Sequence, residues 1–285
     1  MYNHQRQYFY GFIDSLDVDK DKYQAPYHNV GGFVKYQSIL RENSSLHNSL
    51  DFAINHTFNK WGRKETHLGV SGDLHKNFTF LDSDKQNIGL NINYKHSFGG
   101  YEPKDLALPL SFDNNNGSVD IKPYANLKIK DFKLNVALDF VPTFGDSKEF
   151  MILPSAVIEI PTLAKIIKIK AGITSYFDIP TLNYLRMENP YLSPLARIEN
   201  NNQMDIFAKV NFLTKSNILL SLKGGYKTGN NNYFYEIDQN AGLHNMFVLV
   251  YDNTKTAYIQ LNAAYQIDNK FDLSFNLLYQ NVKTD

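Results

Sequence analysis

The chain has 285 residues, no cysteine, and a formal net charge of zero from 29 basic and 29 acidic side chains. This balance, without a basic stripe, argues against a nucleic-acid-binding protein that neutralises phosphates. The lack of cysteine excludes a disulfide scaffold and thiolate metal sites. Aromatic residues make up 14% of the chain although its mean hydropathy is −0.39, so we expect extensive half-buried surface.

No stretch of the sequence approaches the roughly 18 consecutive apolar residues of a membrane-spanning helix. The N-terminal sequence MYNHQRQYFYGFIDSL has no basic region followed by an apolar stretch, so no signal peptide is visible. These observations exclude a helical membrane protein, but they do not exclude a barrel that crosses the bilayer with strands.

Taken in chain order, the predicted elements are strands in which apolar and polar residues alternate. In 86–98, for example, Leu90 and Ile92 point to one face, and Asn91 and Asn93 point to the other. No helical stripe competes with this period of two, so the sequence predicts an all-β fold. The alternating runs cover 52–58, 88–98, 119–129, 132–140, 167–173, 204–212, 218–222, 257–267 and 273–279.

The chain divides into roughly 14 or 15 predicted strands, most of about 9 to 13 residues, which is close to the length of a tilted bilayer-spanning strand. Long and short connections alternate, which is typical of an up-and-down antiparallel transmembrane β-barrel with an extracellular and a periplasmic end. We therefore predict a single β-barrel domain over residues 1–285. Asparagine clusters at 114–116, 200–202 and 230–232 are predicted to lie at the outer end, where turn chemistry would allow them.

The main alternative fold is a soluble β-sandwich or barrel whose apolar face covers a core and whose aromatic residues bind carbohydrate. Two features favour the membrane barrel. The polar face is rich in Asn, Lys, Asp and Ser, as a wet lumen requires, and the apolar face carries aromatic residues toward strand ends, as interfacial girdles require. The predicted girdle residues are Tyr94, Phe98, Phe132, Phe140, Phe150, Phe212, Tyr226, Tyr265 and Tyr279.

Three segments carry a family resemblance. SYFDIPTLNYLRMENPYLSP, from Ser175 to Pro194, has a strand that ends in a loop with a Glu-Asn-Pro-Tyr-Leu motif. Residues 231–275 contain a YFY strand and a VYD strand end, and VDIKPYANLKIKDFKLNVAL forms a hairpin before both. Together they resemble the TonB-dependent-receptor-like outer-membrane β-barrel proteins of Bacteroidota. The sharpest motif is structural and comprises Glu188, Asn189, Pro190, Tyr191 and Leu192.

The resemblance covers most of the chain and implies a longer protein. In that family further strands follow and a signal-bearing segment precedes the matching part. This sequence also lacks the terminal aromatic residue that usually ends an outer-membrane strand, and an odd strand number does not suit bacterial barrels, which have even numbers. We therefore expect these residues to be the middle of a larger barrel.

Candidate sites for chemistry are few. Asp17, Asp19 and Asp21 alternate like the start of a calcium loop, but Lys22 and His28 stand where such a loop needs Gly and Glu, so we predict a solvated acidic loop. His67 and His75 with Asp73 share a strand face, but eight residues of strand span roughly 26 Å, too far for one metal ion. No catalytic motif is present. We predict no enzyme activity, no catalytic residues, no metal and no cofactor.

The polar face offers a candidate lumen. Its lysines would favour anionic solutes if they cluster in the pore; alternatively, those near the periplasmic end extend toward head groups and water. The predicted lumen-facing residues are Asn91, Asn93, Lys95, Lys122, Lys128, Lys133, Asn135, Lys168 and Lys170.

Together these features predict an integral barrel of the bacterial outer membrane that serves passage or docking of a solute at the cell surface, by a porin- or receptor-like mechanism. The alternatives are a structural barrel that anchors partner proteins and the soluble carbohydrate-binding fold. The expected partners are outer-membrane lipid and a solute or envelope protein, and no nucleic acid.

Overall fold

The computed structural model describes residues 2–8, 24–38, 46–80, 83–102, 111–161, 166–214, 218–239, 246–267 and 271–285. These residues form one 13-stranded sheet in which each strand pairs with its sequence neighbours. The strands are β1 Tyr2–Tyr8, β2 Gln24–Gln37, β3 Leu46–Asn59, β4 Arg63–Phe80, β5 Ser83–Tyr101, β6 Phe112–Ile129, β7 Phe132–Gly145, β8 Phe150–Pro161, β9 Ile167–Asp178, β10 Asn201–Leu213, β11 Ile218–Ile237, β12 Phe247–Ile267 and β13 Phe271–Thr284; α1 is Leu182–Glu188.

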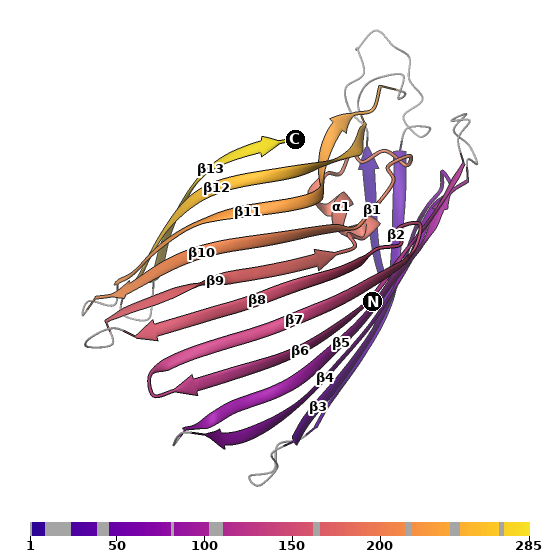
Figure 1. The fold of residues 1–285 in the computed structure, drawn as a ribbon. Helices are drawn as coiled ribbons and strands as arrows, with labels where there is room; N and C mark the ends of the chain where they lie inside the picture. Colours follow the sequence, from indigo (N-terminus) through magenta and orange to yellow (C-terminus); the bar gives the residue numbers. More distant parts are fainter. Residues whose placement is uncertain are drawn as a thin grey trace.

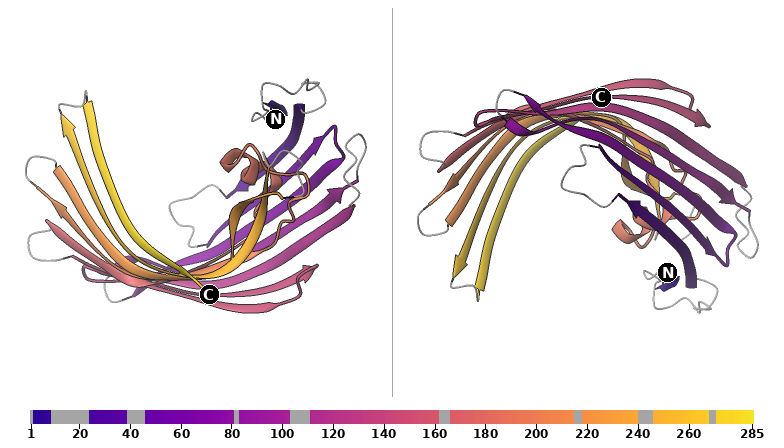
Figure 2. Two further views of the ribbon diagram at one scale, coloured as in Figure 1. Left: turned by 90° about the horizontal axis from the view of Figure 1, so that it is seen from above. Right: turned by 90° about the horizontal axis from the view of Figure 1, so that it is seen from below.

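The sheet is a curved, open wall with up-and-down topology (Figures 1 and 2). Every pairing between neighbouring strands of the sheet is antiparallel, and β1 and β13 form its two edges. The all-β, up-and-down prediction is confirmed. The soluble sandwich is wrong, because the described strands form one continuous sheet instead of two packed layers.

Connections of different length separate the two ends of the sheet. The three longest follow β1, β5 and β9, and the ends of these strands lie at the same end of the sheet, which we call the long-loop end. Shorter connections, such as those that follow β4, β6 and β12, join strand ends at the opposite, short-turn end. This alternation is as the sequence predicted. No helix among the described residues is long and apolar enough to cross a bilayer.

Strand number and asparagine placement differ from the sequence-based expectation. The described part of the chain has 13 strands instead of 14 or 15 because several strands continue through predicted loops. Residues 114–116 pair with β5, and Asn202 and Asn230 pair with each other across β10 and β11. These asparagines lie near the long-loop end but within the sheet, because their backbone groups have strand partners. Asn200 instead precedes β10, and Asn231, with a φ of 57°, lies at a register shift between β11 and β12.

The convex face of the sheet is apolar. Ile92 on β5 and Ile121 on β6 are cross-strand partners on this face, and their side chains are 43% and 39% exposed. Aromatic rings lie toward both ends of the face: Phe98 and Phe150 toward the long-loop end, and Phe132 and Phe212 toward the short-turn end. A continuous apolar surface of this extent needs a partner other than water.

The concave face is polar, and the main buried core lies on it at the long-loop end. The connection 179–200, which contains α1, folds inward there (Figure 2, left). We call residues 179–200 the inward segment. Its apolar residues pack with strand-end residues from distant parts of the sheet. The buried cluster comprises Tyr27, Trp61, Tyr101, Leu182, Leu185, Leu192, Ala196, Ile198, Met246 and Leu249.

Candidate functional site

Helix α1 starts the inward segment because its local sequence favours one short helix with an apolar side. Thr181 is the N-cap, and its side chain accepts a hydrogen bond from the backbone N–H of Tyr184 at 3.2 Å. Leu182 and Leu185, three residues apart and thus on one side of the helix, are both fully buried. Met187 is 68% exposed. The helix therefore docks one side against the wall and leaves the other toward the open concave space.

Charged groups are buried beneath α1. Arg63 and Glu65 on β4 are 1% and 4% exposed, and Arg186 of α1 is 3% exposed. Glu65 Oε1 accepts a hydrogen bond from the Leu182 N–H at 2.7 Å, and the Arg186 guanidinium lies 3.2 Å from the centroid of the Tyr27 ring. Burial lowers the pKa of Arg186 to about 10, and interaction with Tyr27 opposes that shift. The side chain keeps its charge at neutral pH.

The buried guanidinium groups are only partly satisfied. Nε and Nη1 of Arg63, and Nε and Nη2 of Arg186, have no hydrogen-bond partner within the part of the chain that the structure describes. An unpaired buried donor on a charged group costs upwards of about 1–3 kcal/mol. Burial of apolar side chains therefore stabilises the docked inward segment, and the unpaired guanidinium donors reduce that stabilisation.

The Glu-Asn-Pro-Tyr-Leu motif attaches the inward segment to the far side of the sheet. The Glu188 carboxylate accepts hydrogen bonds from the hydroxyls of Tyr184 and Tyr233 at 2.7 Å each and from Tyr235 at 3.0 Å. Burial alone would raise the pKa of Glu188, but the three tyrosine donors together lower it below the ordinary value. The carboxylate is thus ionised at neutral pH and holds α1 against β11.

The rest of the motif pairs with β12. Asn189 caps α1 through its N–H to the Leu185 carbonyl, and its Oδ1 accepts from the Tyr191 N–H at 3.0 Å. Leu192, which is 1% exposed, forms a parallel bridge with Phe247, whose N–H donates to the Tyr191 carbonyl at 2.9 Å. Pro190 lies in the turn between these contacts. The motif therefore links the inward segment to β11 and β12.

All nine residues predicted to face the lumen share the face of the sheet that carries the inward segment. Cross-strand pairing fixes this: Asn91 pairs with Lys122, Asn126 with Asn135, and Glu159 with Lys170. Successive partners on this face reach Glu65 and Asn116, which contact the inward segment. That this face lines a lumen remains a prediction. The nine residues are Asn91, Asn93, Lys95, Lys122, Lys128, Lys133, Asn135, Lys168 and Lys170.

Acidic partners that the sequence analysis missed accompany three of these lysines. The Nζ atoms of Lys95, Lys122 and Lys133 lie 3.2, 3.7 and 3.2 Å from carboxylate oxygens. The partners are Asp178, Asp139 and Glu159. The concave face is therefore a mosaic of ion pairs and amides, which weakens the case for an anion-selective surface.

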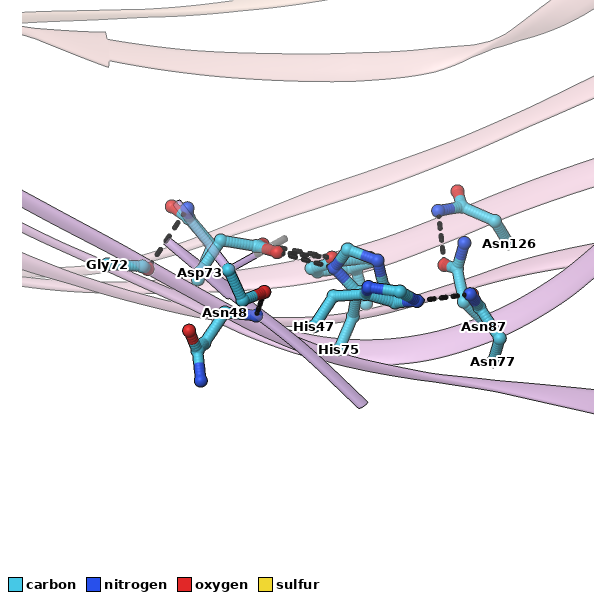
Figure 3. A network of polar contacts seen from close by, with 11 residues as sticks. His47, Asn48, Gly72, Asp73, His75, Asn77, Asn87 and Asn126 are labelled. Atoms are coloured by element: carbon cyan, nitrogen blue, oxygen red, sulfur yellow. Dashed lines mark hydrogen bonds and ion pairs between the residues drawn. The ribbon is translucent and has the colours of Figure 1, made fainter. Parts of the chain in front are cut away.

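A second polar cluster lies near the short-turn end of the concave face (Figure 3). Asp73 accepts hydrogen bonds from the Tyr124 hydroxyl at 2.9 Å and forms a 2.7 Å contact with His75 Nδ1. The His47 and His75 rings lie 4.9 Å apart, and His47 Nε2 is 2.8 Å from Asn77 Nδ2. We call these five residues the Asp73 network. Their side-chain contacts cross β3, β4 and β6.

The structure separates the two histidines considered for a metal. His67 Nδ1 contacts Ser97 Oγ at 2.7 Å, whereas His75 contacts Asp73. Within the described ranges, no group of three or more potential metal ligands is placed to hold an ion. The acidic loop with Asp17, Asp19 and Asp21 lies outside the described residues.

No family model and no curated protein matches the sequence. Several solved structures match the fold of the chain. The FrpB iron transporter from Neisseria meningitidis aligns with a TM-score of 0.66 and 9% identity over 99% of this chain and 49% of that chain. The siderophore receptor PirA from Pseudomonas aeruginosa aligns with a TM-score of 0.64 and 13% identity, covering 92% and 51%.

A third match is the pyoverdine outer-membrane receptor FpvA from Pseudomonas aeruginosa bound to pyoverdine, with a TM-score of 0.62, 10% identity, and coverage of 92% and 45%. At these identities the likeness shows the fold alone, which is that of part of the β-barrel of these receptors and transporters. The chain spans about half the length of each of these structures.

Proposed function

We propose that this chain forms part of the wall of an outer-membrane β-barrel that binds and passes a solute at the cell surface. The observation that carries the proposal is the distribution of polarity over the two faces. Ile92 and Ile121 are exposed on the convex face, while Asn91, Asn93 and Lys122 lie on the concave one. A soluble barrel would reverse this, because it buries its apolar side chains inside.

Lipid is the partner that fits the convex face. Backbone polar groups within a bilayer must be satisfied by the protein, and in the described sheet every strand pairs with a neighbour on both sides except β1 and β13, which are the edges. We propose that further strands join these edges and close the barrel. The receptors and transporters that share the fold support this arrangement. A Bacteroidota origin and coupling to TonB are implied only by the sequence resemblance.

The inward segment gives the barrel a constriction. It lies inside the curve of the wall and connects β2 and β5 with β11 and β12 through the buried cluster and the tyrosines packed against it. Passage would then need displacement of α1 or a route beside it. The role is physical and involves no catalytic step.

The test is insertion followed by conductance. The protein, purified in detergent, is expected to migrate faster before boiling than after, and to insert into planar bilayers. Stepwise currents would support passage, whereas insertion without currents would favour the anchoring role over passage. Failure to insert, together with good solubility in the absence of detergent, would contradict the membrane barrel itself.

A further inference from the structure

A cavity of about 1000 Å³ opens at the long-loop end, bordered by β6, the connection between β7 and β8, the inward segment, and the ends of β10, β11 and β12. Eight of its lining residues are asparagines. All of its described lining residues lie between Ser111 and Asn253.

Charge and burial divide this cavity into a neutral floor and a charged rim. Asn114, Asn116, Asn200 and Asn201 are each at most 8% exposed. The charged lining residues, such as Asp113 and Lys148, are all exposed. A ligand that reaches the floor therefore meets amide groups, not formal charges.

Two atoms of the floor have no protein partner. Asn116 donates to the Ile198 carbonyl and Asn200 donates to Ser147 Oγ, so these amides hold the inward segment and the neighbouring loop. Nδ2 of Asn114 and Oδ1 of Asn201 are fully buried and form no hydrogen bond with the described residues. One is a donor and the other an acceptor. Leaving each of these groups without a partner costs about 1–3 kcal/mol.

We propose that this cavity binds a neutral, hydroxyl-rich solute of the saccharide class. A hydroxyl group both donates and accepts a hydrogen bond, as do the side-chain amides of the eight asparagines that line the cavity, whereas a carboxylate or phosphate only accepts. A buried anion or cation would also need an opposite charge on the floor, and the floor has none. The inference rests on the proposed function, because it names the class of solute that the barrel takes up.

The experiment combines a glycan array with titration of the purified protein in detergent micelles. The array carries neutral and anionic oligosaccharides, and the tightest neutral binder is then titrated by calorimetry. Asn114→Leu and Asn201→Leu are each expected to weaken its binding at least tenfold. Neither should lower thermal stability, because a side chain of similar size replaces an amide that has an unpartnered atom.

Asn211→Leu is the matched control. Asn211 lies on β10 and on the same face as Asn201, but ten residues along the strand, roughly 33 Å away. Its substitution is expected to leave glycan affinity unchanged. Equal losses in all three variants would overturn the assignment of the site.

Other outcomes also decide the question. Binding of only anionic glycans, or of no glycan, overturns the proposal, as does wild-type affinity in both cavity variants. A protein that inserts and conducts but binds no neutral glycan contradicts this inference alone. A protein that binds the glycan but never enters a bilayer contradicts the proposed function instead.

Discussion

The two ends of the concave face are stabilised in different ways. At the long-loop end, Tyr27, Trp61 and Leu185 are excluded from water by the inward segment. At the short-turn end, the side chains of Asp73 and His75 remain about a quarter exposed. One end is held by long-range apolar packing, and the other by hydrogen bonds between neighbouring strands. The inward segment is therefore attached to the wall by packing, whereas the wall itself is held by contacts between neighbouring strands.

The largest expected effect comes from breaking the long-loop end. Leu185→Ala should remove about 2–5 kcal/mol of docking energy, because Leu185 is fully buried in the cluster. The wall should stay intact while protease cleavage within 179–200 and single-channel current both increase. Met187→Ala, on the exposed side of the same helix, is the control. If both variants conduct like the wild type, the inward segment does not restrict the pore.

A second effect compares the two faces of one strand. Ile92→Lys at the centre of β5 should cost about 2–4 kcal/mol in a lipid-facing position. Asn93→Lys, one residue along, places the same charge on the concave face opposite Asp120 and should be close to neutral. Folding free energies in lipid vesicles would measure both. A neutral Ile92→Lys variant would mean that the convex face does not contact hydrocarbon.

The smallest expected effect is a loss of stability from a substitution at the short-turn end. A Cβ on Gly89 would lie 2.5 Å from the Tyr124 ring, so Gly89→Ala should displace Tyr124 from Asp73 and destabilise the wall by about 1–3 kcal/mol. Gly69→Ala lies on the same face with nothing within 4 Å and should be neutral or slightly stabilising. Thermal unfolding in detergent would compare them. Equal effects would show that the contact between Tyr124 and Asp73 contributes nothing.

The strands of the wall could be predicted from the sequence because the alternation of apolar and polar residues is a local pattern. Alternation along 86–98 places Ile92 and Asn93 on opposite faces whatever the partner strands are, and the structure agrees. The predicted set from Asn91 to Lys170 also lies on a single face for this reason. Which carboxylate meets which lysine, as in the pair of Lys95 with Asp178, depends on strands 83 residues apart and could not be seen.

The inward segment was missed for a related reason. The sequence predicts a loop after a strand here, although Leu182, Leu185 and Ile198 are more apolar than an exposed loop needs. That excess was the available signal. The burial partners, Tyr27 and Trp61, are more than a hundred residues away and lie at a strand end and in a tight turn. No pattern within the segment points to them.

The inward segment is tethered at both ends, to β9 and β10, which pair directly with each other. A detached α1 therefore stays close to its docking surface, at an effective concentration in the millimolar range. A loop of this size closes within microseconds. We expect α1 to detach only briefly before it docks again. A solute would then keep α1 detached only while it occupies the space that α1 left.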